Sequence, residues 1–293
     1  MLEKDKVIDF IKSALREDIG KIDITTTFLI PSTLRIKADI VSKSSGTLAG
    51  LSFVEIVYGI LDSGVRIKFN SQDGDSIEPG KAVCYLEGPA TSILKGERVV
   101  LNLLSRSSGI ATITKKFVGK VKKYNVDIMD TRKTTPNMRY IERYAVRVGG
   151  GKNHRFGLFD QVLIKDNHLA ALRELKPNLK EVSIINDSVH TAKKRAQKNV
   201  KIEVEVKNIA EFEEALSAGA DIIMLDNMSI ETIKEAVKIR NASDTKARQV
   251  KLEASGGINL ENVEEYAKTG VDRISVGALT HSASSLDFSL EVI

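Results

Sequence analysis

The second half of the chain alternates short apolar runs with helical patterns, and this alternation restricts the fold more than any other feature of the sequence. Four runs look like buried strands, and two more precede them; the six ranges are 126–129, 161–164, 201–206, 221–225, 250–254 and 272–276. Strands that alternate with helices favour right-handed crossovers and a parallel sheet. Because the sheet is long enough to curl, we expect a (β/α) barrel, with a doubly wound open sheet as the alternative.

Helix boundaries in this half can also be read from capping residues. Asn208, Ser229 and Asn259 can each cap the helix that follows, and Gly219 suits the end of the first of these helices. Pro136 fits the first turn of an earlier helix, where its missing N–H costs nothing. The expected elements are therefore compact helices between strands.

The first part of the chain has a different pattern. A charged amphipathic helix opens it, and strand-like and helix-like segments then alternate irregularly up to about residue 90. This pattern predicts a compact α+β domain over residues 1–110, followed by the barrel domain over 111–278.

Composition excludes several classes of protein. The net charge is +5 and the pI is near 9.0, but acidic residues are spread along the chain and only 5% of residues are aromatic, which argues against nucleic-acid binding. No apolar run approaches the roughly 18 residues of a membrane span. The start does not resemble a signal peptide, and Cys84 is the one cysteine, so we expect a cytoplasmic protein without disulfides or a CxxC metal site.

Basic side chains are concentrated between Asp130 and His168. This stretch reads DTRKTTPNMRYIERYAVRVGGGKNHRFGLFDQVLIKDNH. Its key cations fall at the ends of expected elements, and they are Arg132, Lys133, His154, Arg155 and Lys165. Since α/β sheets bind ligands at the carboxyl ends of their strands, the stretch predicts an anion-binding site.

The later strands deliver acids and glycines to the same ends. Glu205 and Asp226 are carboxylates suited to ribose hydroxyls or a hydrated Mg²⁺, although structural salt bridges are an equal alternative when they are taken alone. The sequences SGG at 255–257 and VGA at 276–278 follow the last two strands. Glycine loops at those positions favour phosphate binding.

Nine blocks in order resemble one family. They are ALREDIGKIDITT at 14–26, GERVVLNLLSRSSGIAT at 96–112, DTRKTTP, GGGKNHRFGL, LIKDNH, EVEV, MLDN, ASGGI and ISVGALTHS. Together they resemble the quinolinate phosphoribosyltransferases, the decarboxylating nicotinate-nucleotide pyrophosphorylases of NAD biosynthesis.

The resemblance implies a fold and an assembly. The fold class is α/β, with an N-terminal α/β sandwich domain, an incomplete (β/α) barrel, and a C-terminal segment, about 279–293, that packs back on the first domain. The implied enzyme is a homodimer with shared active sites. It joins quinolinate to phosphoribosyl pyrophosphate with Mg²⁺ and releases pyrophosphate and CO₂, leaving nicotinate mononucleotide.

The resemblance also implies residue roles. Arg98 would reach into the partner's site, and Thr131 would contact substrate. Arg132, His154, Arg155 and Lys165 would hold the carboxylates of quinolinate, with Lys133 between the two substrates. Glu205 and Asp226 would hold the ribose and its Mg²⁺ and act with Lys133 and Lys165 in catalysis. The phosphate would be bound by Ser255, Gly256, Gly257, Val276, Gly277 and Ala278.

One departure from the family pattern and two alternative functions accompany this interpretation. The chain from His168 to Glu205 is longer than the family spacing by about ten residues, around 176–188, a length that a loop tolerates. The local alignment therefore leaves Glu203 open as the ligand, with Glu205 preferred. A ModD-type relative of the same fold and a non-enzymatic anion or nucleic-acid binder are the alternative functions.

Overall fold

The computed structural model describes residues 4–175 and 181–293, which form two compact units. The first unit contains the described residues up to Lys115 together with Lys133–Gly151 and Ala278–Ile293, and the second contains Lys116–Arg132 and Lys152–Gly277. The chain therefore passes between the units several times. The boundary expected near residue 110 lies close to the first of these passages, between Lys115 and Lys116.

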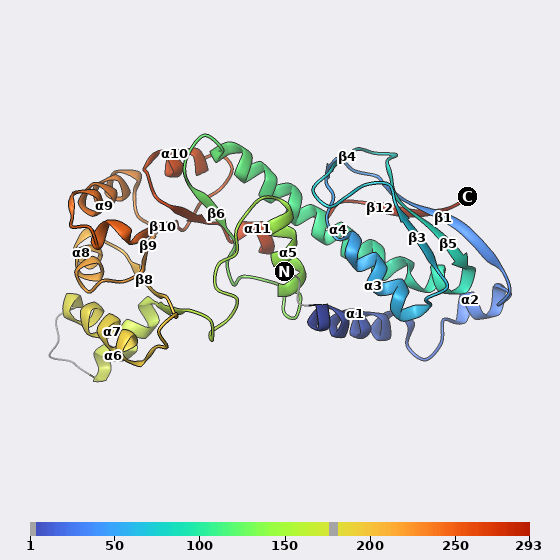
Figure 1. The fold of residues 1–293 in the computed structure, drawn as a ribbon, viewed down its shortest axis with the longest axis horizontal. Coiled ribbons are helices and arrows are strands. Elements are labelled where there is room, and N and C mark those ends of the chain that lie inside the picture. The colour runs from blue at the N-terminus through green and yellow to red at the C-terminus, as the bar shows by residue number, and fades with distance from the viewer. Residues whose placement is uncertain (1–3, 176–180) are drawn as a thin grey trace. The chain divides into compact units, whose positions relative to one another are not determined.

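The first unit has an antiparallel sheet of four strands and a separate two-stranded ribbon (Figure 1). The strands are β1 (Arg35–Ser42), β2 (Gly46–Thr47), β3 (Arg66–Phe69), β4 (Ser76–Ile77), β5 (Ala82–Pro89) and β12 (Phe288–Val292). The order of the larger sheet is β12-β1-β5-β3, and Ile40 of β1 lies opposite Leu290 of β12. A segment near residue 290 thus completes the sheet that residue 35 begins.

The first unit also contains helices, several of which share a core with this sheet. They are α1 (Lys4–Ile19), α2 (Ile24–Leu29), α3 (Leu51–Leu61), α4 (Ala90–Val121), α5 (Arg139–Val148) and α11 (Ala278–His281). The shared core includes Ile11 of α1, Phe53 of α3 and Ile40 of β1, all fully buried. This layer of helices on a sheet is the expected α/β sandwich.

Helix α5 explains why the chain returns to the first unit after β6. Its Ile141 is buried in the core of the first unit, and the ring of Tyr144 lies 5.6 Å from that of Phe53. The Tyr144 hydroxyl also bonds to Asp73. The helix begins at Arg139, later than Pro136 suggested, because Asn137 between them has a positive φ of 64°.

The second unit is built on six parallel strands. They are β6 (Asp127–Met129), β7 (Val162–Ile164), β8 (Ile202–Val206), β9 (Ile222–Asp226), β10 (Lys251–Ser255) and β11 (Arg273–Ser275), in the order β6-β11-β10-β9-β8-β7. Consecutive strands are neighbours from β7 to β11, and the last strand pairs with the first. That circular order belongs to a barrel, and it is broken between β6 and β7, the two edges. The unit is therefore an incomplete barrel.

The barrel helices are short and begin at polar caps. They are α6 (Asp166–Leu175), α7 (Glu181–Arg195), α8 (Ile209–Ser217), α9 (Ile230–Ala242), the 3-10 turn η1 (Ala247–Gln249) and α10 (Val263–Lys268). The side chains of Asn208 and Ser229 each accept a hydrogen bond from the backbone amide three residues later, as expected of helix caps. The expectation for Asn259 is wrong, because its oxygen bonds to the amides of Glu261 and Asn262 in a turn, and α10 starts at Val263.

No helix in the described part of the chain combines the length and apolar character that crossing a membrane requires.

Candidate active site

The carboxyl ends of the barrel strands bring the expected acids together with a lysine. Asp226 at the end of β9 is paired in register with Ser255 at the end of β10, and Ser255 is paired with Ser275 of β11. Glu205 lies near the end of β8, and Lys165 follows β7 directly. Because the strands are parallel, all of these residues lie at the same end of the sheet.

Lys165 and Glu205 form an ion pair across the ends of β7 and β8. The Glu205 side chain is 7% exposed, whereas that of Lys165 is 44% exposed. The carboxylate is therefore held inside the rim while the ammonium group faces solvent. Next to them, the amide of Lys165 donates to Nδ1 of His168 at 2.9 Å, so His168 has a structural role in the first turn of α6.

The loops after β9 and β10 interlock at a glycine. Gly256 has a φ of 97°, and a Cβ at this position would lie 2.1 Å from Oδ1 of Asn227. The Asn227 amide donates to the carbonyl of Ser255 at 2.9 Å, and Asn227 itself has a φ of 52°. A side chain at residue 256 would displace Asn227, so the close approach of the two loops requires glycine.

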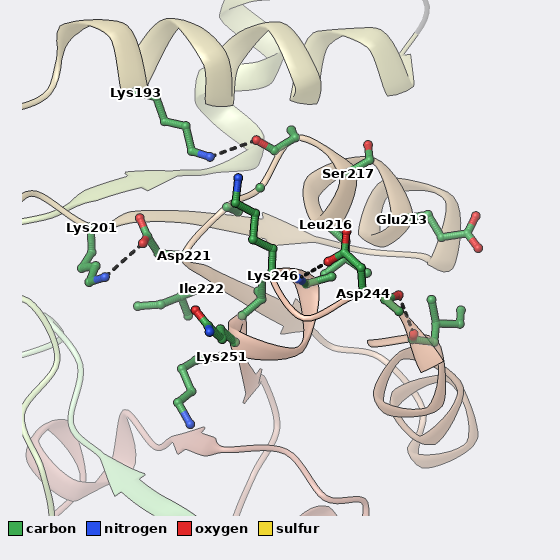
Figure 2. A pocket seen from close by; sticks show the side chains of 18 of the residues that line it. Lys193, Lys201, Glu213, Leu216, Ser217, Asp221, Ile222, Asp244, Lys246 and Lys251 are labelled. Carbon is green, nitrogen blue, oxygen red and sulfur yellow. Dashed lines mark hydrogen bonds and ion pairs between the residues drawn. The ribbon is translucent and has the colours of Figure 1, made fainter. Parts of the chain in front are cut away.

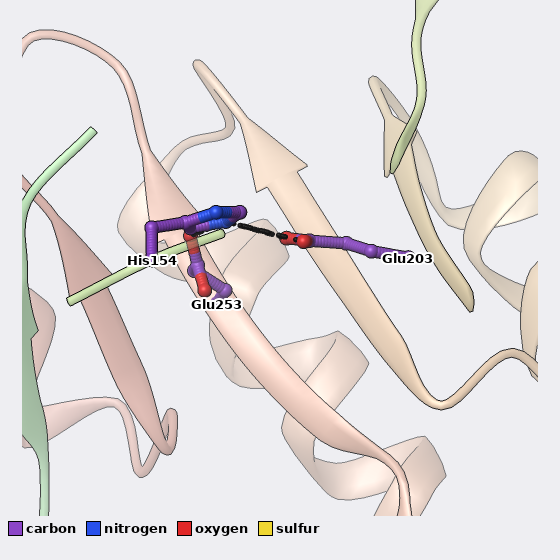
Figure 3. Close-up of side chains that lie close together, drawn as sticks. All are labelled: His154, Glu203 and Glu253. Carbon is purple, nitrogen blue, oxygen red and sulfur yellow. Dashed lines mark hydrogen bonds and ion pairs between the residues drawn. The ribbon is translucent and has the colours of Figure 1, made fainter. Parts of the chain in front are cut away.

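His154 lies in the barrel interior against two acids, Glu203 of β8 and Glu253 of β10 (Figure 3). Its Nε2 is 3.1 Å from Oε2 of Glu203 and 3.3 Å from Oε1 of Glu253. The side chains of both acids are fully buried, and that of His154 is 6% exposed. We call these three residues the acid cluster.

The protonation of the acid cluster follows from its hydrogen bonds. Burial disfavours a charged ring on His154 and lowers its pKa, whereas hydrogen bonds to Glu203 and Glu253 favour a proton on Nε2. A doubly protonated ring conflicts with the amide of Arg155, which donates to Nδ1 at 2.7 Å and requires a bare nitrogen there. The hydrogen bond from the Arg155 amide therefore requires a neutral ring with its proton on Nε2. Burial and the nearby Glu253 also raise the pKa of Glu203, so the extra proton belongs to the two carboxyl groups.

The same tautomer bears on metal binding. The ligand atoms of the acid cluster lie within 4.8 Å of one another, close enough to surround a metal ion. A metal on Nε2 would need the proton on Nδ1, where the Arg155 amide already donates. The cluster therefore does not suit a metal ion in this arrangement.

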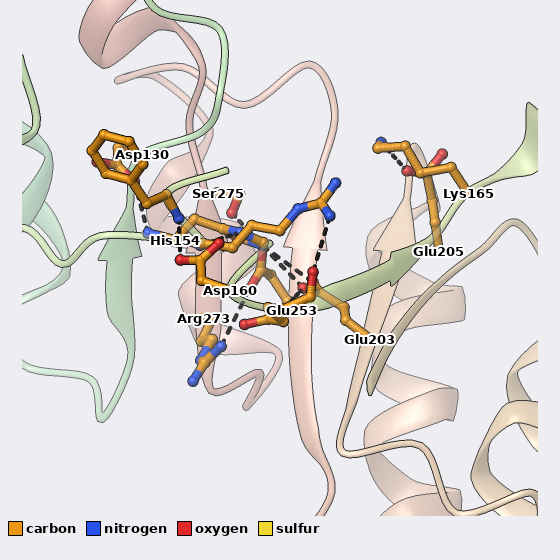
Figure 4. A network of polar contacts seen from close by, with 12 residues as sticks. Asp130, His154, Asp160, Lys165, Glu203, Glu205, Glu253, Arg273 and Ser275 are labelled. Atoms are coloured by element: carbon orange, nitrogen blue, oxygen red, sulfur yellow. Dashed lines mark hydrogen bonds and ion pairs between the residues drawn. The ribbon is translucent and has the colours of Figure 1, made fainter. Parts of the chain in front are cut away.

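Further side chains connect the acid cluster to the rest of the barrel (Figure 4). Ser275 donates to Oε1 of Glu253, Gln161 donates to Glu203, and the backbone amide of His154 donates to Asp130 at 2.7 Å. Sequence reasoning missed Glu253 and Asp130. The available signal was the two-residue period of a strand, since Glu253 lies on the same face of β10 as Ser255.

His154 was expected to hold a substrate carboxylate, but its Nε2 faces two acids. An anion approaching that nitrogen would be repelled, which makes direct contact unfavourable in this arrangement. The buried Glu203 is committed to His154 and Gln161, whereas Glu205 is paired with Lys165 at the rim. Of the two candidate ligands, the geometry thus favours Glu205.

Arg155 and Arg132 form a second cationic feature of the barrel. Arg155 is buried, and its Nη1 donates to the carbonyl of Gln161 at 3.1 Å. Burial lowers the pKa of the Arg155 guanidinium, and the charge of Arg132 lowers it further. Arg132 itself is exposed. Two cations close enough to repel each other provide a favourable position for an anion.

The remaining expected residues are divided between the units. Thr131, Val276 and Gly277 belong to the second unit, where the amide of Val276 donates to the carbonyl of Met129 at 3.0 Å. Arg98, Lys133 and Ala278 belong to the first unit. There the side chain of Arg98 is 61% exposed, and the Lys133 carbonyl accepts from Thr280 at 2.7 Å.

The lengthened segment lies partly outside the described residues. Residues 176–180 are not described, and residues 181–188 form the first half of α7.

A cavity of about 1090 Å³ opens at the other end of the barrel, around the amino ends of β8 to β11 (Figure 2). It is rich in lysine, and two of these lysines bond to neighbouring parts of the second unit. Lys193 donates to the carbonyl of Ala218 at the end of α8, where the helix carries partial negative charge, and Lys201 pairs with Asp221 at 3.0 Å. The candidate active site is therefore at the carboxyl end.

Comparisons with known proteins agree along the whole chain. Models of the quinolinate phosphoribosyl transferase N-terminal and C-terminal domains match residues 23–108 and 110–291. A protein of Bacillus subtilis named probable nicotinate-nucleotide pyrophosphorylase (carboxylating) is 43% identical over 276 residues, which cover 94% of this chain and 90% of that protein.

Solved structures give the same result. The nicotinate-nucleotide pyrophosphorylase from Francisella tularensis has a TM-score of 0.88 and 38% identity, covering 100% of this chain and 98% of its own. NadC from Streptococcus pyogenes has a TM-score of 0.89 and 38% identity, with coverages of 100% and 99%. Because the two domain models span most of the sequence, the chain belongs to the quinolinate phosphoribosyl transferase family.

Proposed function

We propose that this chain transfers the phosphoribosyl group of phosphoribosyl pyrophosphate to the ring nitrogen of quinolinate and removes one carboxylate as CO₂. One observation carries the proposal beyond family membership. Lys165 and Glu205 are paired at the rim on the carboxyl end of a parallel barrel, Arg132 follows β6 at the same end, and Arg155 lies close enough to Arg132 for their charges to repel. A site of this kind can hold two anions that repel each other.

Quinolinate carries two carboxylates, which need fixed cations. We assign Arg132, Arg155 and Lys165 to this role. A guanidinium offers paired N–H donors that match a carboxylate, and the ammonium group of Lys165 is accessible to solvent. Lys133 and Thr131 follow the same strand end as Arg132, and we propose that Lys133 acts between the two substrates.

Phosphoribosyl pyrophosphate would bind along the later strands. Ser255 ends β10 and is followed by Gly256 and Gly257, and Val276 and Gly277 connect β11 to Ala278, the first residue of α11. We assign the phosphate to these loops, because glycine lets backbone N–H groups approach the oxygens closely. Glu205 and Asp226, at the ends of β8 and β9, are placed to accept hydrogen bonds from ribose hydroxyls.

The donor set of Glu205 and Asp226 also fits Mg²⁺. Magnesium favours one or two carboxylates completed by water and phosphate oxygens, and these two acids end adjacent parallel strands. When bound, Mg²⁺ would neutralise charge on the departing pyrophosphate. Asn227 donates to Asp226 at 2.9 Å and would hold that carboxylate in place.

The reaction divides into two steps. The ring nitrogen forms a bond to ribose C1 as the bond from C1 to the pyrophosphate oxygen breaks, and carboxylates near C1 favour the positive charge that develops there. The ribosylated ring is cationic, so it accepts the electron pair left when the bond to the 2-carboxylate breaks. CO₂ leaves as that bond breaks, and the ring carbon then takes up a proton. Positioning and electrostatics are sufficient, and no covalent enzyme intermediate is needed.

A substrate assay tests the proposed function. The purified chain should release pyrophosphate and CO₂ only when quinolinate, phosphoribosyl pyrophosphate and Mg²⁺ are all present. Nicotinate lacks the second carboxylate and should be a much poorer substrate, since part of the cationic site would have no partner. Equal turnover of nicotinate, or none of quinolinate, would reject the proposal.

We further propose a homodimer in which Arg98 serves the partner's site. The exposure of Arg98 on α4 supports this idea. Arg98→Ala and Lys165→Ala should each be inactive, and mixing them under conditions of subunit exchange should restore part of the activity because one hybrid site is intact. Exchange without recovery would argue against shared sites.

A cytoplasmic location is also proposed. It is supported by the single cysteine, Cys84, which is buried and free. Fractionation of cells that express the chain tests it.

A further inference from the structure

We propose that Glu203 and Glu253 are positioning residues, which hold the ring of His154 and thereby fix Arg155 on the loop across the open side of the barrel. This inference rests on the proposed function, because Arg155 is assigned there to quinolinate. Neither acid reaches the rim, and both are fully buried. Their effect would therefore be transmitted through His154.

The loop of residues 152–161 crosses the side where the barrel is open. Strands β6 and β7 are the two edges of the sheet and do not pair with each other. The segment between them therefore joins two strands that no backbone ladder holds together, unlike the other connections of the barrel. Its start is held by Lys152, which pairs with Met129, and by Asp130, which accepts from the amide of His154 at 2.7 Å. Beyond that point the loop needs side-chain anchors.

The ring of His154 provides such an anchor. It points into the barrel and meets β8 through Glu203 and β10 through Glu253, two strands separated by β9 (Figure 3). Glu253 is itself held by Ser275 of β11. One side chain from the loop is thus tied to the interior of the sheet at several strands.

The anchor reaches Arg155 through a closed cycle of four residues. Glu203 accepts from the ring of His154, and Nδ1 of that ring accepts from the amide of Arg155 at 2.7 Å. The guanidinium of Arg155 donates to the carbonyl of Gln161 at 3.1 Å, and the Gln161 side chain donates back to Glu203. The backbone and the guanidinium of Arg155 are therefore each connected, through one intervening residue, to the same buried carboxylate.

Kinetics of variants provide the first test, with Glu203→Ala and Glu253→Ala as the disruptive changes. Each should raise the KM for quinolinate by about tenfold or more while the KM for phosphoribosyl pyrophosphate stays within about twofold, because the loop carries the group assigned to quinolinate. Glu253→Gln should stay close to wild type, since an amide oxygen still accepts from His154 and Ser275. Glu211→Ala is the matched control: Glu211 of α8 is also buried, but it accepts a hydrogen bond from the amide of Lys207, before the helix begins.

A purely structural role predicts another result. Glu203→Ala would then behave like Glu211→Ala, with lower stability and equal changes in both KM values, and the inference would be wrong. It would also be wrong if Glu253→Gln were as impaired as Glu253→Ala, because the hydrogen bond would then not be what matters.

Hydrogen exchange without substrates separates this inference from the proposed function. In Glu203→Ala the amides of residues 152–161 should exchange faster than in wild type, while those of β1 should be unchanged. If the wild-type protein does not turn over quinolinate, the proposed function is rejected. The role of Glu203 and Glu253 in holding the loop is then tested by hydrogen exchange alone. Unchanged exchange in the loop would overturn the anchor.

Discussion

One ion pair of the first unit and the acid cluster of the second unit differ in how well their charges are matched. In the first unit Arg106 of α4 pairs with Glu142 of α5, one cation with one anion. Nη2 and Nε of Arg106 lie 2.7 and 3.1 Å from Oε1 of Glu142, and Nη1 donates to the carbonyl of Ala283 at 3.0 Å. Thr135 donates to the same carboxylate twice. We call Arg106 and Glu142 the matched pair.

The acid cluster of the second unit is not matched in this way. Two carboxyl groups share one imidazole, and Oε2 of Glu253 accepts no hydrogen bond within the described part of the chain. Arg273 is its nearest cation, at 3.8 Å. The matched pair joins helices and a loop of the first unit, whereas the acid cluster keeps surplus negative charge beneath the candidate active site. The difference suggests that the first serves stability and the second serves function.

The largest expected effect comes from breaking the matched pair. Glu142→Ala leaves the guanidinium of Arg106 in the interior without its anion, so it should lower the free energy of unfolding by about 3–5 kcal/mol. Urea denaturation followed by circular dichroism measures this loss. The double variant Arg106→Met with Glu142→Leu is the control and should recover much of it. A loss as small as that of a surface pair would contradict the description of a matched pair.

A milder change, glutamate to glutamine, should separate the two groups most clearly. Glu142→Gln removes a charge that Arg106 needs and should cost about 2 kcal/mol of unfolding free energy. Glu203→Gln relieves repulsion with Glu253, so its cost should be below about 1 kcal/mol. Both variants are measured in the same denaturation series. Equal losses would show that the acid cluster is as well matched as the pair.

The acid cluster also predicts a pH dependence. Burial and the charge of Glu253 raise the pKa of Glu203 above its ordinary value of 4.5, so the folded state holds a proton that the unfolded chain releases at lower pH. This contribution to stability is complete below about pH 4.5 and is lost as the pH rises through the raised pKa of Glu203. The urea midpoint of the wild type should therefore fall across that window, and Glu203→Gln should flatten the curve. Parallel curves for the two proteins would refute the assignment.

The smallest effect is expected at an exposed pair near the acid cluster. Lys152 and Asp127 lie 2.8 Å apart, with side chains 64% and 39% exposed. Lys152→Ala should change the free energy of unfolding by less than about 1 kcal/mol, because water screens the pair. A larger loss, measured by the same denaturation, would mean that charge itself and not burial sets the order of these effects.

Local sequence patterns predicted the repeating part of the fold. All six barrel strands lie where apolar runs suggested them, and Asn208 and Ser229 cap their helices. These features depend on neighbouring residues, so a short stretch contains the information. The shared end of Lys165, Glu205 and Asp226 also followed, because parallel strands place their carboxyl ends together.

Features that depend on distant contacts were not predictable from such patterns. The amphipathic pattern of α5 showed that one face would be buried, but not that Ile141 would join the core of the first unit. The environment of His154 was missed for the same reason, since Glu203 and Glu253 are 49 and 99 residues away. A histidine within a basic motif was taken to face an anion, and the acids that surround it come from two other strands.

The pairing of β1 with β12 has a consequence for how the protein is made. Residues 35–42 emerge early from a ribosome, but their partner at 288–292 is synthesised only after the entire barrel. The edge of β1 therefore waits, with unpaired backbone groups, for most of translation, a state that invites pairing with other nascent chains. Pairing between neighbouring nascent chains on a polysome, and binding by chaperones, should therefore involve the exposed edge of β1 rather than the barrel.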